Sequence, residues 1–518
     1  MRIHLFFLLL LFTTPLLAQD STDNTPEIRI TQGNVFKNDE REIPIDIIGH
    51  DENGYYILYA GGRFGQKKNK SIRKFTPSLE PSGEEIDLIP EDQEGEARTI
   101  GIAQTGDKIV HVWSLLTETE KKLFYQLIDL DDFSLQSSSL ITAFSNEETD
   151  ITRTYSNFIM SQDKSRIYLL YGMPTKKGET ARINLKVFDN SFKEIKNESY
   201  DFPYPEDTFY IHDLFFSNKD ELMVLAKKYN SDRILKEERN KGYQYLLYQL
   251  QDQEFHHIAN IPVNDKHLRM LEPVWLPDGN LVLTGLYSKL DMYAMSGVFY
   301  TRIDTENGTV ISAKEHPFGH DFYTALLDNE NKINRVLKKL EKQKYEDPYY
   351  ILRKVLKKPD DHIVLLTEQI HSVSHDFVIQ YFHENIAMIE LDGSGDIVWT
   401  NKIGKKNIKN NVSIYSSFFP VKRANDIFLL YNGNSSNLDH RKGSLANAFA
   451  PNGRAFMATK VRDDGTYLRT VLATGEDMEG ITIRPSLTNW IDENTLLLFG
   501  QDIDNLKNQR FIKVIFEP

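Results

Sequence analysis

The sequence predicts an all-β protein, a β-propeller in which eight four-stranded blades follow one another along the chain. Three observations predict it. One phrase of strand, tight polar turn and strand recurs eight times, at intervals of roughly 55 to 80 residues. The second strand of each repeat is apolar at nearly every position, as in a sheet covered on both faces. Turn chemistry is the same in each copy, which favours a propeller over a generic β-sandwich or two β domains.

The clearest copy of the repeat runs from Trp275 to Gly285 and contains the turn Pro-Asp-Gly-Asn at 277–280. Proline presets the first corner of such a turn, and Gly and Asn tolerate positive φ. We name the strands of a repeat A to D. The predicted B strands are 55–59, 109–113, 166–171, 222–226, 281–285, 363–367, 427–431 and 496–500. The predicted C strands are 71–75, 123–130, 183–189, 243–250, 298–304, 386–392, 455–461 and 511–516.

The two ends of the chain predict how the ring closes. The eighth repeat ends after strand C at Pro518, without a strand D, whereas an additional strand at 27–31 precedes the first strand A at 43–48. We expect this N-terminal strand to complete the last blade, because closure removes exposed sheet edges. Seven blades with one additional element is the alternative.

A helical insertion interrupts the period at about 320–346. Ile333, Val336, Leu337 and Leu340 recur with the spacing of one helix face, and the opposite face is basic through Arg335, Lys338, Lys339 and Lys342. Either this helix packs on the propeller with a solvated basic face, or the basic face docks a partner or an anionic surface.

The first 18 residues have the features of a secretory signal peptide. Arg2 is followed by an apolar run at 5–12 and by a small-residue cleavage site ending at Ala18. The run is shorter than the about 20 residues of a membrane-spanning helix. We therefore expect a single propeller domain at 19–518 without a transmembrane segment, exported to the periplasm or secreted. Gln19 is not the cysteine of a lipoprotein.

Composition excludes several classes of site. The 518 residues include no cysteine, so disulfides and metal–thiolate sites are excluded. The formal net charge is −14, and it becomes −15 when residues 1–18, with one arginine and no acid, are removed. This acidic balance argues against general nucleic-acid binding.

Long connections mark one face of the propeller as the candidate binding face. The B–C and D–A connections are long and emerge on the same face, where binding residues usually lie. The B–C loops lean basic and the D–A loops lean acidic. Either this face binds a charged ligand, such as an acidic glycan or a charged protein surface, or it is only a solvated rim of mixed charge. The 432–453 loop is either mobile or folded over the channel mouth. The candidate binding residues are Arg63, Lys67, Arg182, Arg233, His371, His375, His440 and Arg441.

No motif indicates catalysis or a bound cofactor. His371, His375 and His383 lie on an expected B–C loop, but their spacing needs a helix to aim two rings together and no third ligand is evident, so we assign no metal. A Gly-x-Ser-x-Gly elbow, His-Glu-x-x-His, phosphate-binding and dinucleotide-binding glycine patterns, and the sialidase box are all absent.

Residues 389–403, with Asp392-Gly-Ser-Gly-Asp-Ile-Val-Trp399, resemble the quinoprotein-like and WD40-like propeller repeats of bacteria. In those repeats such a segment forms a C–D hairpin with a docking tryptophan. Only this repeat carries the Trp, and the quinone-binding residues of that family have no counterpart here. The resemblance therefore implies the fold and no cofactor. The overall layout resembles exported propeller proteins of unassigned activity that are common in Gram-negative bacteria.

The leading hypothesis is a non-enzymatic exported propeller that binds a protein or glycan partner through its long-loop face. The alternative is a propeller enzyme, a glycoside hydrolase or lyase, acting on polysaccharide at the channel mouth. A deep acidic or His/Tyr-lined pocket would favour the enzyme. The sequence leaves the oligomeric state open.

Overall fold

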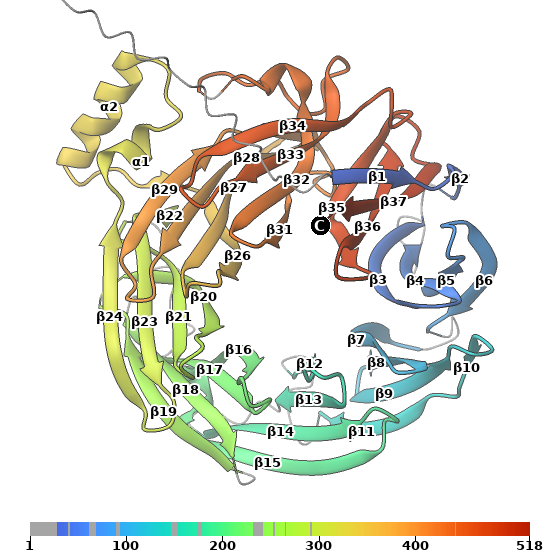
Figure 1. Ribbon diagram of the computed structural model, residues 1–518. Helices are drawn as coiled ribbons and strands as arrows, with labels where there is room; N and C mark the ends of the chain where they lie inside the picture. Colours follow the sequence, from blue (N-terminus) through green and yellow to red (C-terminus); the bar gives the residue numbers. More distant parts are fainter. Residues whose placement is uncertain are drawn as a thin grey trace, which may run out of the picture.

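The structure is a computed structural model. It describes residues 28–39, 42–61, 69–89, 94–146, 154–172, 179–230, 242–251, 254–264, 266–290, 293–440 and 442–517. In these ranges the chain is a β-propeller: antiparallel sheets follow one another around a ring, with the first strand of each sheet innermost (Figure 1). The predicted signal peptide lies outside the described residues.

The first four sheets, numbered in chain order, take up residues 43–262. Sheet 1 holds β3 (Ile43–Asp51), β4 (Gly54–Gly61), β5 (Asn69–Phe75) and β6 (Pro81–Asp87). Sheet 2 holds β7 (Glu96–Thr105), β8 (Lys108–Leu116), β9 (Glu120–Asp129), β10 (Ser134–Leu135) and β11 (Ser139–Ser145). Sheet 3 holds β12 (Tyr155–Met160), β13 (Arg166–Gly172), β14 (Thr180–Asp189) and β15 (Glu194–Pro205), followed by the 3-10 turn η1 (Glu206–Thr208). Sheet 4 holds β16 (Phe209–Phe216), β17 (Leu222–Tyr229), β18 (Tyr243–Gln251) and β19 (Glu254–Pro262).

The remaining sheets of the described chain bring the ring back to its start. Sheet 5 holds β20 (His267–Trp275), β21 (Leu281–Ser288), β23 (Gly297–Asp304) and β24 (Thr309–Pro317), and the short β22 (Ala294–Met295) pairs with β25 (Asp347–Pro348). Sheet 6 holds β26 (Tyr350–Lys357), β27 (Ile363–His375), β28 (Val378–Leu391), β29 (Ile397–Ile403) and β30 (Asn407–Asn410). Sheet 7 holds β31 (Phe419–Arg423), β32 (Asp426–Asn434), β33 (Arg454–Val461) and β34 (Tyr467–Thr474), with η2 (Ser435–Asn437) after β32. Sheet 8 holds β35 (Ile481–Trp490), β36 (Thr495–Asp502) and β37 (Asn508–Phe516), completed by β1 (Ile28–Gln32) and β2 (Phe36–Lys37).

The N-terminal strand completes the last sheet, as the sequence predicts. β1 pairs antiparallel with β37 over the register from Ile28 opposite Phe516 to Gln32 opposite Ile512. Sheets 8 and 1 then share an apolar core in which the rings of Phe75 and Phe511 lie 4.8 Å apart, edge to face. Pairing of the two chain ends therefore closes the ring.

The core lies between sheets rather than in one central mass. Each pair of neighbouring sheets in the described chain shares one cluster of buried side chains. The B strands are covered on both faces by these clusters, and β21, for example, is buried at all of its positions. This arrangement confirms the predicted B strands and explains why they do not alternate between apolar and polar residues.

Two helices lie beside sheets 5 and 6, at the predicted insertion (Figure 1). They are α1 (His320–Thr324) and α2 (Glu330–Glu341). Val336 and Leu340 of α2 pack on the core shared by sheets 5 and 6, whereas Lys338 and Lys339 are exposed. The apolar and basic faces of the predicted helix are thus confirmed. Within the described ranges, no helix is long and apolar enough to span a bilayer.

One connection differs from its prediction. His371, His375 and His383 were expected on a B–C loop, but β27 continues to His375 and β28 begins at Val378, so they lie on an extended hairpin. The loop expectation is therefore wrong. Residues 370–383 are rich in the β-branched and aromatic residues that favour strands, so the composition of this segment itself indicates a hairpin.

Candidate functional site

Of the predicted binding residues, four lie in the described chain, and none of these four lines the cavity of ≈ 820 Å³ described below. Arg182 forms a two-point ion pair with the exposed Asp201 on the next strand, at 2.6 and 2.9 Å. His371 stacks between the rings of Tyr349 and Phe382. His375 lies beside the tip of the β27–β28 hairpin, and the carbonyl of His440 accepts a hydrogen bond from Arg469. The other four, Arg63, Lys67, Arg233 and Arg441, lie outside the described residues.

The histidines predicted to cluster are separated by the geometry of the hairpin. His371 is paired with Phe382, and Ile370 with His383, so His371 and His383 lie on opposite faces of the two strands. No group of three or more His, Asp or Glu side chains in the described part of the chain is placed to hold a metal ion.

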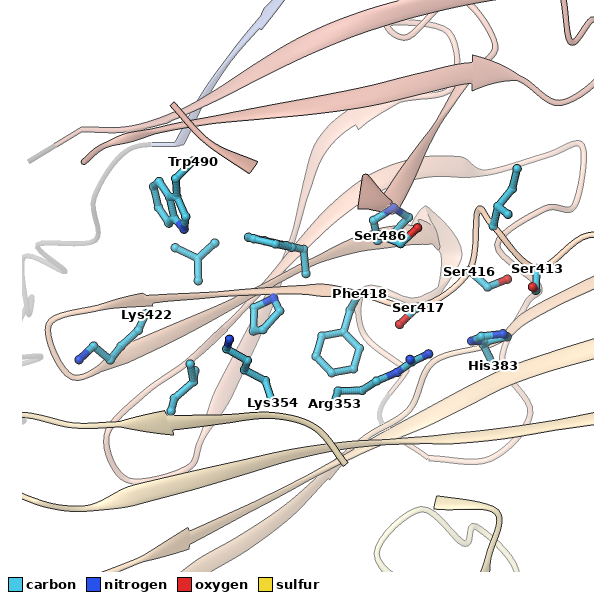
Figure 2. Close-up of a pocket in the computed structure, with 16 residues that line it drawn as sticks. Arg353, Lys354, His383, Ser413, Ser416, Ser417, Phe418, Lys422, Ser486 and Trp490 are labelled. Carbon is cyan, nitrogen blue, oxygen red and sulfur yellow. The ribbon is translucent and has the colours of Figure 1, made fainter. Parts of the chain in front are cut away.

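An elongated cavity of ≈ 820 Å³ lies against the inner strands of sheets 6, 7 and 8. Its wall comes from β26, from β31 with the D–A connection before it, and from β35. Figure 2 shows Trp490 and Lys422 at one end and His383 and Ser413 at the other, with Phe418 and Arg353 between them. The lining residues are Arg353, Lys354, Leu356, His383, Ser413, Ile414, Ser416, Ser417, Phe418, Phe419, Pro420, Val421, Lys422, Pro485, Ser486 and Trp490.

Basic and hydroxyl groups dominate the polar part of this lining. Arginine, two lysines and a histidine face the cavity together with four serines, and the lining residues of the described chain include no Asp or Glu. This composition contrasts with the net charge of −14 on the whole chain. The cavity is therefore a locally basic site on an acidic protein.

A β-bulge in β26 brings two of the cations to the cavity. Leu352 pairs with Thr367 and Lys354 with Leu366, so Arg353 is left without a partner residue in the register. In a regular strand, neighbouring side chains would point to opposite faces. Here Leu352 is buried, whereas Arg353 and Lys354 are both exposed. A bulge re-aims side chains in this way and is common beside functional sites.

Behind Arg353 lies a buried carboxylate, Glu368 of β27, whose side chain is 0% exposed. Its Oε2 accepts from Arg353 Nε at 2.8 Å and from the hydroxyl of Ser417 at 2.7 Å. Its Oε1 lies 2.9 Å from Nζ of the buried Lys405, and its Oε2 lies 3.6 Å from Nδ1 of His383. One buried anion thus orients three of the side chains that line the cavity.

The charge of Glu368 is maintained despite its burial. Burial alone would raise the pKa of Glu368, but the charges of Lys405 and Arg353 and the contact with His383 hold that pKa well below its usual range. Burial lowers the pKa of Lys405. The ammonium of Lys405 nevertheless donates two hydrogen bonds besides its ion pair with Glu368, to the carbonyl of His383 at 3.0 Å and to Asn407 Oδ1 at 2.9 Å.

Ser417 adopts a conformation that is rare for a residue other than glycine. Its φ is 84°, in the left-handed region. The hydrogen bond from its hydroxyl to Glu368 accompanies this strained backbone. Strained residues are concentrated at functional sites, where the surrounding structure holds them in place.

The 432–453 loop supports the segment that carries the serines. Ala448 and Phe449 pack with Tyr415 in a small buried cluster, and Asn447 exchanges hydrogen bonds with the backbone of Ile408. The described part of this loop therefore folds onto sheets 6 and 7, next to residues 412–415 at one end of the cavity. The predicted position of this loop over the channel mouth stays a prediction.

Carboxylates occupy the inner strands of the neighbouring sheets. Asp213 lies on β16 and Glu272 on β20, each beside a shift in strand register. Burial, followed by repulsion from Asp213, raises the pKa of Glu272, while Lys354 of the cavity partly lowers it. Burial also raises the pKa of Asp213. Glu272 of sheet 5 thus lies within electrostatic reach of Lys354 in the cavity and of Asp213 in sheet 4.

The sequence predicted binding residues on the long loops, whereas the cations of this cavity lie on inner strands. The prediction therefore missed the cavity. One signal was present: Leu-Arg-Lys at 352–354 places two adjacent charges in the segment before the predicted B strand at 363–367, where the repeat pattern places a strand A. A regular half-buried strand does not accommodate that pattern, which therefore indicates a bulge.

Comparisons with known proteins find similarity in structure only. No protein-family model and no curated protein matches the sequence. The WD40 domain of SCAP from fission yeast matches with a TM-score of 0.36 at 10% identity, over 95% of this chain and 98% of that one. A polysaccharide lyase, Uly1, matches with 0.39 at 8% identity over 94% and 100%, and the Dos1 propeller with 0.40 at 9% identity over 92% and 96%. Similarity at this level carries no argument about activity.

Proposed function

We propose that this chain is an exported, non-enzymatic propeller that binds a segment of a glycan in the cavity along β26, β31 and β35. The observation that carries the proposal is the cavity itself. Its ≈ 820 Å³ is within the range of small-ligand sites, and it is elongated and concave, unlike a protein-docking surface. Serine hydroxyls supply hydrogen bonds for sugar hydroxyls, and Phe419 and Trp490 supply apolar contact.

Export is part of this proposal. The features of residues 1–18 support cleavage before Gln19 and transfer to the periplasm or beyond, where extended glycans are found. Mass spectrometry of the protein purified from the cell envelope tests this. A mature N-terminus at Gln19 is expected, and an intact Met1 on the mature protein would overturn the export proposal.

The binding proposal is tested by screening the purified chain against neutral and acidic oligosaccharides and by filling the cavity. Ser486 of β35 is exposed and lines the cavity, so Ser486→Trp should lower glycan affinity about tenfold or more. Ser137→Trp is the matched control, because Ser137 is exposed in the connection between β10 and β11 of sheet 2, away from the cavity. Absence of binding to every oligosaccharide, or equal binding by Ser486→Trp and the unaltered protein, would overturn the proposal.

A second candidate is a glycoside hydrolase, favoured by the carboxylates Asp213 and Glu272. A carboxyl group with a raised pKa is suited to general-acid catalysis, and a second carboxylate completes the usual pair. Product analysis of bound oligosaccharides separates this candidate from binding alone. Cleavage that is lost in Glu272→Gln while binding is retained would establish the hydrolase, and unaltered oligosaccharides after long incubation would exclude it for those glycans.

A further inference from the structure

We infer that the glycan bound in this cavity is anionic, and that its carboxylate or sulfate groups are bound by Arg353 and Lys354 at one position and by Lys422 at another. The inference rests on the proposed function, because it concerns the chemistry of the same ligand. Both kinds of acidic group share the oxygen geometry that a guanidinium recognises.

The residues that line the cavity leave a positive charge for the ligand, although two carboxylates outside the lining face its cations: Glu272 lies within electrostatic reach of Lys354, and Glu384 within reach of Lys405. Glu368 contributes one negative charge, against which Arg353 and the buried Lys405 contribute two positive charges. The lining adds Lys354 and Lys422 and contains no acid of the described chain. Low-dielectric walls focus such a potential in a cavity. A neutral sugar would leave these cations unused.

Arg353 is held ready to bind an anion. Its contacts within the described chain go to Glu368, through Nε at 2.8 Å and Nη2 at 2.7 Å, and 31% of its side chain stays exposed. Arginine has five N–H donors in a rigid fork, so donors remain for a ligand after this pairing. Because Glu368 fixes the guanidinium, less side-chain entropy is lost when an anion binds.

The cations are distributed along the cavity. Arg353 and Lys354 are adjacent on β26, whereas Lys422 lies near the end of β31, at the same end of the cavity as Trp490 (Figure 2). Lys357, whose carbonyl accepts from Lys422, lies three residues beyond Lys354 on β26, which is about 10 Å at the usual rise of a strand. Lys422 donates one bond, to the carbonyl of Lys357 at 2.7 Å, and an ammonium has three donors. This spacing suits a chain with acidic groups on more than one ring.

The test compares oligosaccharides of equal length that differ in charge. Tetragalacturonate, a sulfated heparin-derived tetrasaccharide and neutral cellotetraose are titrated into the full chain by calorimetry at low and at high salt. We expect tetragalacturonate or the sulfated tetrasaccharide to bind more tightly than cellotetraose, with affinity that falls as salt rises. Tighter binding of tetragalacturonate would identify a carboxylate as the acidic group, and tighter binding of the sulfated tetrasaccharide would identify a sulfate.

Variants connect this preference to the named side chains. Lys354→Gln, which removes no contact to Glu368, and Arg353→Gln should each lower affinity for the acidic ligand about tenfold or more, and Arg353→Lys should lower it less than Arg353→Gln. Lys342→Gln on the exposed face beyond α2 is the charge-matched control and should bind normally. If Arg353→Gln fails to fold, Lys354→Gln and Lys422→Gln still decide the outcome.

The outcomes separate the two proposals. Equal affinity for cellotetraose and the acidic tetrasaccharides, with no effect of Lys354→Gln and Lys422→Gln, would overturn the anionic inference and leave the glycan proposal standing. Binding of inorganic sulfate with no binding of any tetrasaccharide would overturn both. Acid-selective binding that Ser486→Trp does not weaken would place the site elsewhere and overturn both for this cavity.

Discussion

At the scale of single residues, Glu368 organises the candidate site. A carboxylate with no exposed surface is stable only when paired, and here Arg353, Lys405 and Ser417 supply the partners from three separate segments of the chain. Removing one partner of a buried ion pair leaves the others uncompensated. The residue that shapes the site therefore also stabilises sheet 6.

Glu368→Gln should lower the free energy of unfolding at neutral pH by about 3–5 kcal/mol, because Arg353 and Lys405 lose their common counterion. The folded-state pKa of Glu368 is depressed. Its stabilisation is therefore complete above the ordinary carboxyl pKa of about 4.3 and is lost as pH falls toward the depressed value. Urea unfolding of both proteins between about pH 7 and pH 3 measures this.

The free energy of unfolding of the unaltered protein should approach that of Glu368→Gln steadily as pH falls below about 4. Glu341→Gln, at an exposed position of α2, is the control and should change stability little at any pH. A difference that stays constant across this range would show that folding leaves the pKa of Glu368 unshifted, and a difference that grows as pH falls would show that Glu368 is neutral in the folded protein. Either result would contradict the charge balance on which the anionic site depends.

At the scale of elements, irregularities rather than regular strands build the site. The bulge at Arg353 turns two consecutive cations toward the cavity, and β35 has its own register shift between Ile483 and Thr488, which includes Ser486. Regular inner strands would direct alternate residues into the inter-sheet cores. The inner strands can therefore serve both the core and the cavity.

The inserted helix gives a test at the scale of one element. Asn329 caps α2, its side chain accepting from the amides of Asn331 at 2.9 Å and Lys332 at 3.3 Å. Asn329→Ala should weaken the helix by about 1 kcal/mol. Hydrogen exchange should show faster exchange in α2 while the sheets are unchanged, since α2 is covered only in part. Asn329→Asp retains a capping oxygen, so α2 of this variant should exchange at the rate of the unaltered protein. Faster exchange throughout the propeller in Asn329→Ala would contradict this local role.

At the scale of the whole molecule, stability depends on closing the ring. β1 brings Ile28 and Ile30 onto the core shared by sheets 7 and 8 and occupies the outer edge of β37. Without β1, the edge of β37 would be open to pairing with another chain. The first described residues thus stabilise a sheet formed by the last ones.

A chain that begins at residue 33 should unfold at a lower urea concentration than one that begins at residue 28, and it should aggregate when concentrated. Both differences follow from the lost strand and the exposed edge. Chemical denaturation and light scattering measure them, and the chain beginning at residue 28 is the control. Equal unfolding midpoints would show that β1 contributes nothing to closure.

Sequence alone determined the repeat, the positions of the B and C strands, the inserted helix and the pairing of the N-terminal strand with the last sheet. These features depend on local signals: apolar runs, tight turns and the period between them. Trp275 to Gly285 illustrates this, since β20 ends and β21 begins on either side of the predicted turn, with Gly279 at a φ of 86°.

Only the tertiary structure decided where the candidate site lies. Glu368, Arg353, Lys405 and Ser417 are separated by up to 64 residues along the chain, and nothing local marks them as neighbours. The cavity exists because inner strands from successive sheets converge, and because a bulge turns Arg353 and Lys354 to the same side. Long-range packing and strand register set these relations, whereas composition and period report on each repeat by itself.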